Sequence, residues 1–272
     1  MKMNIRSVAA MGWLLAFALL VSSGCAHRDD GSTPVKLRVL SYNIHHGEGM
    51  DGRLDLERIA ALITAHAPDL VALQEVDRGV ARTQGRDLPA ELAKATGMEV
   101  IFSRNIEYQG GDYGNAILSR FPVVSSTNLH YRMLRPGEQR GLLQATVRHP
   151  SGRELVFMAT HLDYRSDPVE RLSNVPEIKA ARERFAGLPV IVAGDFNDRP
   201  GGEVHGMMKS GFIDAWEAAG NGDGFTYSST NPDKRIDYIY FDRDSGWRII
   251  RAEVLVTEAS DHLPLLVEAV LP

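Results

Sequence analysis

From about residue 35 to its end, the chain alternates short apolar runs with polar segments that contain glycine and proline. The apolar run after Pro189 stops at Gly194, and a run of this length between two breakers predicts a buried parallel strand. Asp195, Phe196 and Asn197 follow it directly. Side chains alternate along an extended strand, so we expect the Asp and the Asn to point to the same side.

Helices are predicted where apolar residues recur with the helical period. Residues 56–67 carry apolar side chains at i, i+3, i+4, i+7 and i+11, and Pro68 ends this helix. A second helix is expected at 88–97, where a proline near the start suits a first turn. Further helices are predicted at 169–185 and at 203–209.

Strands are predicted where short runs are apolar or alternate between apolar and polar residues. Two such runs flank the first helix, and this βαβ arrangement brings their final residues, Asn43 and Glu75, to the same edge of a sheet. The glycine-rich segment 108–115 is expected to be a loop that leads into 116–119. The predicted strands cover 36–43, 69–75, 98–103, 123–129, 142–147, 154–160, 189–193, 235–241, 247–256 and 265–270.

The order of these elements predicts one α/β domain over residues 36–272. The first half is βαβ-like and the second half is rich in hairpins, without an internal repeat or a linker. Two packed sheets with helices on the outside accommodate both halves.

The first residues have the pattern of an export signal. Two cationic residues precede the apolar run 8–21, which is shorter than the roughly 20 residues that cross a bilayer. The run ends in Val-Ser-Ser-Gly-Cys, which resembles a bacterial lipobox. We therefore expect a lipoprotein signal peptide at 1–24, lipidation of Cys25 and a polar tether at 25–35. The alternative is an ordinary cleaved signal.

This pattern predicts an exported, lipid-anchored protein. Ala26 follows the cysteine, which resembles sorting to the outer membrane, with the domain facing the periplasm. The membrane is thus an expected partner through the anchor, and the protein is expected to be a monomer.

The charge balance and the cysteine count exclude some functions. The chain has 30 Lys and Arg against 35 Asp and Glu, and removal of the signal would make it more acidic. This balance argues against a broad nucleic-acid surface, which is normally basic. Cys25 is the sole cysteine, so an intramolecular disulfide or a thiolate metal site is excluded, and a His-Glu-x-x-His zinc motif is absent.

Polar residues stand at the ends of six predicted strands. One Asn or Asp after a strand usually forms a turn. Six in one chain indicate a shared site, because the carboxyl ends of strands in α/β sheets collect the chemistry. These residues are Asn43, Glu75, His161 with Asp163, Asp195 with Asn197, Asp237, and Asp261 with His262.

Seven short motifs make this pattern specific. Their order resembles that of the endonuclease/exonuclease/phosphatase superfamily, which includes nuclease I-like DNases, abasic-site endonucleases, neutral sphingomyelinases and inositol polyphosphate 5-phosphatases. The resemblance implies a four-layer α/β/β/α sandwich of two packed mixed sheets and metal-dependent cleavage of phosphate esters. The motifs are Ser-Tyr-Asn-Ile (41–44), Leu-Gln-Glu-Val-Asp (73–77), Tyr-Gly-Asn-Ala-Ile-Leu-Ser-Arg (113–120), Thr-His-Leu-Asp (160–163), Gly-Asp-Phe-Asn (194–197), Arg-Ile-Asp-Tyr-Ile (235–239) and Ser-Asp-His-Leu-Pro (260–264).

With this resemblance, the strand-end residues take catalytic roles. Asp195 is expected to orient and deprotonate the attacking water, and Asn197 to hold water or phosphate. His161 and His262 are expected to donate hydrogen bonds to the non-bridging phosphate oxygens. Asp237 is expected to orient His262 or raise its pKa.

The oxygen-rich set of candidate ligands suits Mg²⁺ or Mn²⁺. Glu75 is expected to be the principal ligand, with Asn43 and Asp261 in the inner or second shell. Weaker ligand candidates lie nearby, although the histidine pair among them could instead line the rim. These candidates are His45, His46 and Asp163.

Two further groups are expected near the mouth of the site. Tyr113 and Asn115 are candidates for contact with the phosphate. Arg140 is either structural or part of the site, and the sequence leaves both alternatives open.

These features favour a phosphodiesterase that cleaves a small or lipid-linked phosphate by in-line attack of water. The alternative is an extracytoplasmic nuclease acting on DNA or RNA. The acidic charge balance weakens this alternative, because binding of a duplex requires many cations. A noncatalytic binding lipoprotein is a third hypothesis. The nuclease would require a basic cluster at the mouth, formed by Arg78, Arg82, Arg86, Arg104 and Arg132.

Overall fold

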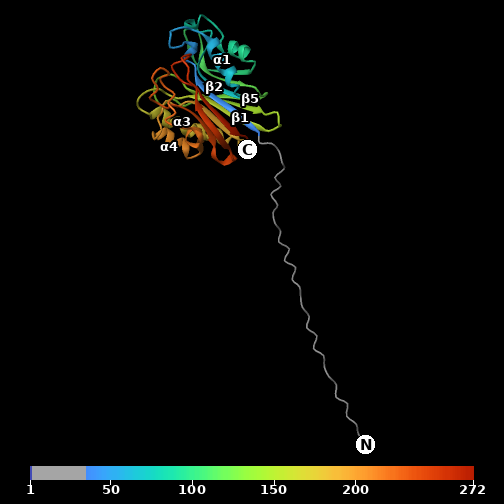
Figure 1. The fold of residues 1–272 in the computed structure, drawn as a ribbon. Coiled ribbons are helices and arrows are strands. Elements are labelled where there is room, and N and C mark those ends of the chain that lie inside the picture. The colour runs from blue at the N-terminus through green and yellow to red at the C-terminus, as the bar shows by residue number, and fades with distance from the viewer. Residues whose placement is uncertain (2–34) are drawn as a thin grey trace. The chain divides into compact units, whose positions relative to one another are not determined.

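The computed structural model describes Met1 and residues 35–272, and within this part of the chain it contains two six-stranded sheets (Figure 1). Apart from Met1, the predicted signal peptide, the lipidation site Cys25 and the tether up to residue 34 lie outside the described residues. Among the described helices, none is both long enough and apolar enough to cross a bilayer.

The first sheet is mixed. Its strands β1 and β2 are parallel, and the remaining neighbours are antiparallel. In spatial order it contains β11 (Arg248–Val254), β12 (Leu265–Val270), β1 (Lys36–Asn43), β2 (Leu70–Arg78), β4 (Gly111–Ser119) and β3 (Glu99–Tyr108).

The second sheet has the same character. Its parallel pair is β7 and β8, and its other neighbours are antiparallel. In spatial order it contains β5 (Val123–His130), β6 (Gly141–Arg148), β7 (Glu154–His161), β8 (Val190–Asp195), β10 (Asp237–Asp242) and β9 (Phe212–Asp214).

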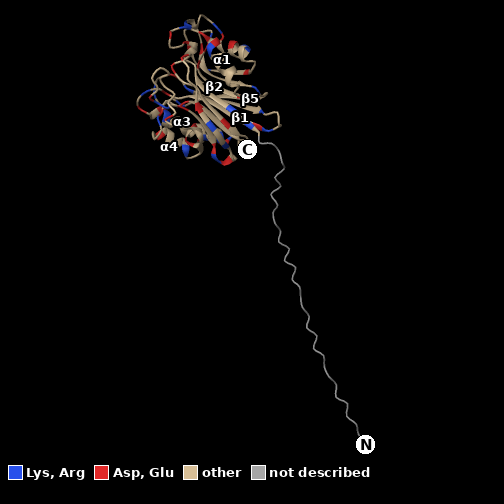
Figure 2. Cartoon of the chain, viewed as in Figure 1, with Lys and Arg blue, Asp and Glu red and all other residues tan. Residues whose placement is uncertain are grey.

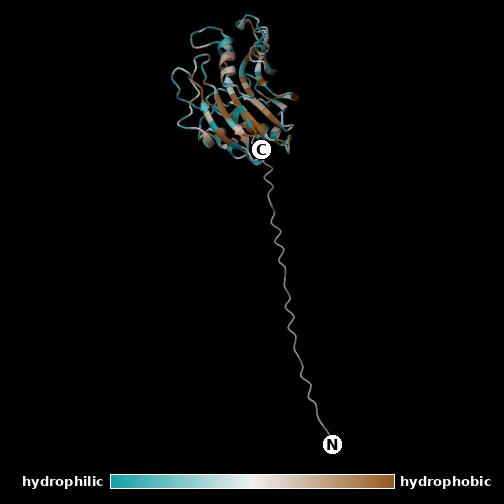
Figure 3. Ribbon diagram, turned by 45° about the vertical axis from the view of Figure 1, so that its right-hand side comes forward, coloured by the Kyte–Doolittle hydropathy of each residue, from teal (hydrophilic) through white to brown (hydrophobic). Residues whose placement is uncertain are grey.

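Apolar side chains hold the layers together. Val39, Phe157 and Ile239 belong to a core between the two sheets, where the strands are strongly hydrophobic (Figure 3). A second cluster lies under α1 and α2, and a third under α3 and α4. The predicted four-layer α/β/β/α sandwich is therefore confirmed. Its helices are α1 (Leu56–His66), α2 (Leu88–Thr96), α3 (Val169–Glu183), α4 (Glu203–Lys209) and the short α5 (Ala215–Ala219).

The ends of the first helices follow from local chemistry. Asp55 caps α1 by accepting hydrogen bonds from the backbone of Glu57 and Arg58, and Asp87 caps α2 in the same way. Gly97 ends α2 in the left-handed conformation that glycine tolerates best.

The prediction of a loop at residues 108–115 was wrong. The segment is not a loop, because β3 continues to Tyr108 and β4 begins at Gly111, so only a tight turn separates them. A Cβ atom at Gly114 would overlap the carbonyl oxygen of Ser103, so glycine here serves close strand pairing rather than flexibility. The sequence patterns also missed two short elements, β9 and α5.

Candidate active site

The inward-facing rows of the second sheet turn from apolar to polar at one end. In β8, Ile191 and Ala193 belong to the core between the sheets, and Asp195 is the next residue on that face. The register places His161 of β7 and Asp237 of β10 beside Asp195 on either side. Three neighbouring strands therefore present an imidazole and two carboxylates at the same edge.

The first sheet contributes Asn43 and Glu75 to this edge. The side-chain amide of Asn43 donates to Oε1 of Glu75 at 3.0 Å and to Oδ2 of Asp195 at 3.2 Å, which links the two sheets. Glu75 lies at a bulge in β2 and has a positive φ of 59°. Its strained conformation turns the carboxylate out of the regular alternation of the strand.

Asn43 therefore offers its NH₂ group, not its oxygen, to the neighbouring carboxylates. Its Oδ1 accepts a hydrogen bond from the backbone N–H of His45 at 3.1 Å. In this arrangement Asn43 orients Glu75 and Asp195, and direct ligation of a metal would require the carboxamide to turn over.

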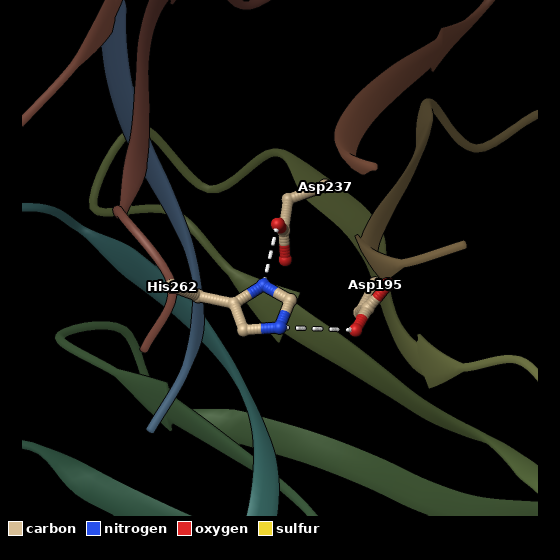
Figure 4. Close-up of side chains that lie close together, drawn as sticks. All are labelled: Asp195, Asp237 and His262. Carbon is tan, nitrogen blue, oxygen red and sulfur yellow. Dashed lines mark hydrogen bonds and ion pairs between the residues drawn. The ribbon is translucent and has the colours of Figure 1, made fainter. Parts of the chain in front are cut away.

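His262 lies between two buried aspartates (Figure 4). Its Nδ1 is 2.8 Å from Oδ2 of Asp237, and its Nε2 is 3.7 Å from Oδ2 of Asp195. Burial alone would lower the pKa of His262, but the charge of Asp237 and the hydrogen bond to it raise this pKa to about 10. Burial and then the charge of Asp237 raise the pKa of Asp195.

His161 behaves differently from His262. Its Nε2 lies 3.5 Å from Oδ2 of Asp195. Burial, followed by the charges of Arg140 and His262, lowers the pKa of His161 well below the usual histidine range. A neutral His161 offers one N–H, so the cationic donor of the pair is His262.

These groups surround a cleft of about 740 Å³. Seven predicted site residues line the cleft. Asn43 and Asp237 are fully buried behind them, where Asn43 contacts Glu75 and Asp237 contacts His262. The lining residues are Glu75, Tyr113, Glu138, Arg140, His161, Tyr164, Ser166, Asp195, Asn197, Arg199, Tyr227, Lys234, Ile236, Asp261 and His262.

Asp195 and Asn197 both line the cleft, but not because an extended strand alternates. Asn197 has a left-handed φ of 49°, and its backbone N–H donates to Oδ1 of Asp195 at 2.9 Å. Its amide also donates to the carbonyl of Leu162 at 3.1 Å. A local turn at the end of β8 therefore sets the position of Asn197.

Four predicted residues are engaged elsewhere and are not among the lining residues of the cleft. Asn115 is buried and donates to the carbonyl of Gly141 at 3.3 Å. The carboxylate of Asp163 is paired with Arg165 at 2.8 Å. The remaining two, His45 and His46, lie beside Glu48. Nδ1 of His45 is 3.2 Å from the carbonyl oxygen of Glu48, and Nε2 of His46 is 3.6 Å from its carboxylate.

Arg140 belongs to the cleft. Its guanidinium is 5% exposed and lies 2.9 Å from Oε1 of Glu138. Sequence patterns missed Tyr164, Tyr227 and Lys234 as lining residues. Lys234 directly precedes the Arg-Ile-Asp motif, and this position is a sequence signal for a lining residue. No local sequence pattern marks either tyrosine.

The donor set of the cleft fits a hard divalent cation. Glu75, Asp195 and Asp261 line it together, and the charges of all three contribute to a raised pKa of Tyr227, after the larger effect of burial. Carboxylates that converge in a partly desolvated cleft favour a cation between them. Oxygen donors without thiolates suit Mg²⁺ or Mn²⁺.

A second cluster of candidate ligands is already neutralised. His205, Asp214 and Glu217 lie close together, but the buried guanidinium of Arg235 donates to Asp214 at 2.7 Å. Nε2 of His205 is 2.9 Å from the same carboxylate. This network holds the chain just before Asp237 and serves as a support for β10.

Comparison with known proteins agrees with this geometry. A family model described as the Endonuclease/Exonuclease/phosphatase family matches residues 40–262. An uncharacterized protein, YbhP, from Escherichia coli K12 is 27% identical over 263 residues, which cover 88% of this chain and 98% of YbhP.

Two further similarities concern a named enzyme and a solved structure. A 5'-tyrosyl-DNA phosphodiesterase from Caenorhabditis elegans is 28% identical over 243 residues, with 85% of this chain and 61% of that protein covered. The crystal structure of an endonuclease/exonuclease/phosphatase from Beutenbergia cavernae has a TM-score of 0.73 and 25% identity, and the match covers 87% of this chain and 72% of that one.

Proposed function

The chain belongs to the endonuclease/exonuclease/phosphatase family and is a hydrolase of the phosphoesterase and nuclease type, and on this premise we propose that it is a metal-dependent phosphodiesterase. The proposed substrate is a small or lipid-linked phosphate ester. The observation that carries the proposal is the placement of Asp195 between two imidazoles, beside Glu75 and Asp261, in one cleft.

Asp195 is the proposed general base. A phosphodiester resists attack because it is anionic and its leaving alkoxide is poor, so the attacking water must be oriented and deprotonated. Asn43 and the backbone of Asn197 hold the carboxylate from two sides. The raised pKa of Asp195 makes it a better proton acceptor than an exposed aspartate.

Cationic and neutral donors are proposed to bind the phosphate oxygens. His262, charged because Asp237 supports its imidazolium, faces the developing negative charge together with Arg140. The side chains of His161 and Asn197 supply neutral donors. Donors fixed in a partly desolvated cleft stabilise the transition state more strongly than the same groups in water.

Glu75 is the proposed metal ligand, with Asp261 beside it and Asn43 as the group that orients it. When bound, Mg²⁺ or Mn²⁺ would polarise a phosphoryl oxygen and stabilise the leaving oxygen.

We expect a chelator to abolish hydrolysis of bis-p-nitrophenyl phosphate. Glu75→Gln, which keeps the shape and removes the charge, is expected to raise the Mg²⁺ concentration at half-maximal rate by about tenfold or more. Glu107→Gln is the matched control, because Glu107 is 79% exposed and is not a lining residue of the cleft. Full turnover in the presence of chelator would refute the metal requirement.

The nuclease alternative depends on five arginines, and in the described part of the chain none of the five lines the cleft. Arg78, Arg82 and Arg86 are each paired with a carboxylate, and Arg104 lies between two. Acidic and basic positions are interspersed over the domain (Figure 2). This distribution supports a small ester over a duplex, which needs several free cations along its backbone.

A substrate panel tests this choice. Bis-p-nitrophenyl phosphate, plasmid DNA, sphingomyelin and inositol phosphates, each assayed with Mg²⁺ and with Mn²⁺, separate the candidates. Preferential cleavage of plasmid DNA would support the nuclease. Absence of hydrolysis throughout would support the noncatalytic lipoprotein.

We also propose that the protein is exported and anchored through acylated Cys25. Cells grown with radioactive palmitate are expected to label the wild-type protein and to leave Cys25→Ser unlabelled. A Cys25→Ser protein that still acquires label would rule out this anchor, and an unlabelled wild type would favour the ordinary cleaved signal.

A further inference from the structure

Two loops of the cleft wall are held by helix α3. The loop 131–140 connects β5 to β6 and carries Glu138 and Arg140, which both line the cleft. The loop 162–168 leads from β7 into α3 and carries Tyr164, which also lines the cleft. The first turn of α3 is bonded to both loops, so this helix supports one wall of the site from behind.

Glu170, in the first turn of α3, holds the loop 131–140 by its backbone. Its Oε1 accepts hydrogen bonds from the N–H groups of Leu134 at 3.2 Å and Arg135 at 3.0 Å, and its Oε2 accepts from Leu134 at 3.1 Å. The side chain of Glu170 is only 7% exposed. A buried carboxylate is costly unless donors surround it, so the carboxylate and the loop fix each other in place.

Two arginines extend this connection to the loop 162–168. The guanidinium of Arg165 donates to the carbonyl of Pro136 at 3.2 Å, which joins one loop to the other. The buried guanidinium of Arg171, also in the first turn of α3, donates to the carbonyl of Asp163 at 2.7 Å. Both loops are therefore bonded to each other and to the same turn of the helix.

Glu170 lies directly behind the residues that form the wall. Glu138 and Arg140 line the cleft on one side, and on the other side they line a small internal space of about 10 Å³ that Glu170 also lines. The guanidinium of Arg140 pairs with Glu138 at 2.9 Å, and its buried Nε has no hydrogen-bond partner among the described residues. The direction of this guanidinium therefore depends on where the loop places Glu138.

We propose that Glu170 is a positioning residue for the reaction. By holding the backbone of the loop 131–140, it fixes the wall that presents Arg140 to the phosphate of the substrate. This inference rests on the proposed function, because it takes Arg140 as a donor to the phosphate ester. Glu170 is not a lining residue of the cleft, so it acts through the loop and not on the substrate.

Two substitutions of Glu170 test this role. Glu170→Ala removes both acceptor oxygens and is expected to lower kcat/KM for bis-p-nitrophenyl phosphate about tenfold, because a small displacement of a binding group slows the reaction. Glu170→Gln keeps an oxygen in place of Oε1, which accepts both N–H groups, and is expected to stay within about twofold of the wild type. The Mg²⁺ concentration at half-maximal rate should be unchanged in both variants, since Glu75 belongs to the other sheet.

The Arg140→Gln background shows whether Glu170 acts through Arg140. In this background Glu170→Ala is expected to lower kcat/KM by less than about twofold, because the group that it positions is already lost. Glu183→Ala is the matched control, since Glu183 is the exposed last residue of α3 and does not line the cleft. It should retain wild-type kcat/KM. All assays are run below the melting temperature of each variant.

Wild-type kcat/KM in Glu170→Ala, or a tenfold loss that persists in the Arg140→Gln background, would overturn the positioning role. The proposed function can fail separately, because hydrolysis by the wild type tests it alone. Calorimetry with inorganic phosphate and Mg²⁺ needs no turnover, and Glu170→Ala is expected to weaken phosphate binding about tenfold while Glu170→Gln retains it. Equal phosphate affinities of the wild type and Glu170→Ala, or no phosphate binding by the wild type, would count against Glu170 even if the ester is cleaved.

Discussion

Asp195→Asn is expected to lower kcat for bis-p-nitrophenyl phosphate by about 10²-fold or more, because the substitution removes the proposed general base. The change keeps the size of the side chain and an oxygen that accepts the hydrogen bond from the backbone of Asn197, while it replaces the oxygen that accepts from Asn43. It also relieves the repulsion between Asp195 and Asp237 that contributes to the raised pKa. We therefore expect the fold to be retained while turnover is lost.

The measurement is steady-state hydrolysis at saturating Mg²⁺, with a thermal melt of each variant. Asp244→Asn is the matched control, since its carboxylate is 77% exposed and pairs with Arg182. Asp244→Asn should retain wild-type kcat. Wild-type turnover in Asp195→Asn would remove Asp195 from the role of base.

His262→Ala is expected to lower kcat by a similar factor of about 10² or more, because it removes the proposed cationic donor to the phosphate. Asp237→Asn should lower kcat less, since it leaves the imidazole in place and removes only the group that orients and charges it. If the two residues act as one unit, Asp237→Asn should cost little in a His262→Ala background.

A double-mutant cycle on kcat measures this dependence. His66→Ala, at the end of α1, serves as the control for loss of an imidazole outside the cleft. Additive losses from Asp237→Asn and His262→Ala would show that the aspartate acts independently of the histidine.

Much of the fold could be predicted because local patterns agree with the tertiary structure. β1, α4 and β12 begin and end at the predicted residues. The site was partly predictable for the same reason. The parallel pair β1 and β2 places Asn43 and Glu75 at one edge of the first sheet, and the parallel pair β7 and β8 places His161 and Asp195 at one edge of the second.

The remaining features depend on contacts that periodicity does not encode. The glycine content of residues 108–115 predicts a loop, although Gly114 lies in a strand and is required for close strand pairing. Asn197 reaches the cleft through a left-handed turn, which a rule for extended strands does not anticipate. Tyr227 reaches it because backbone bridges join its loop to His262, far along the chain.

The direction of β1 has a consequence for the substrate. Val35 is fixed next to the end of the chain by a hydrogen bond from Leu271, whereas Asn43 lies at the other end of the strand, about 25 Å away. A ten-residue tether from an acylated cysteine extends at most about 35 Å. If Cys25 carries the proposed anchor, the chain that leads to the membrane joins the domain at the end of β1 that lies away from Asn43. With this anchor, cleavage of a lipid in the same leaflet would require the end of the domain that carries Asn43 to turn toward the bilayer around Val35, whereas a dissolved ester would need no such turn.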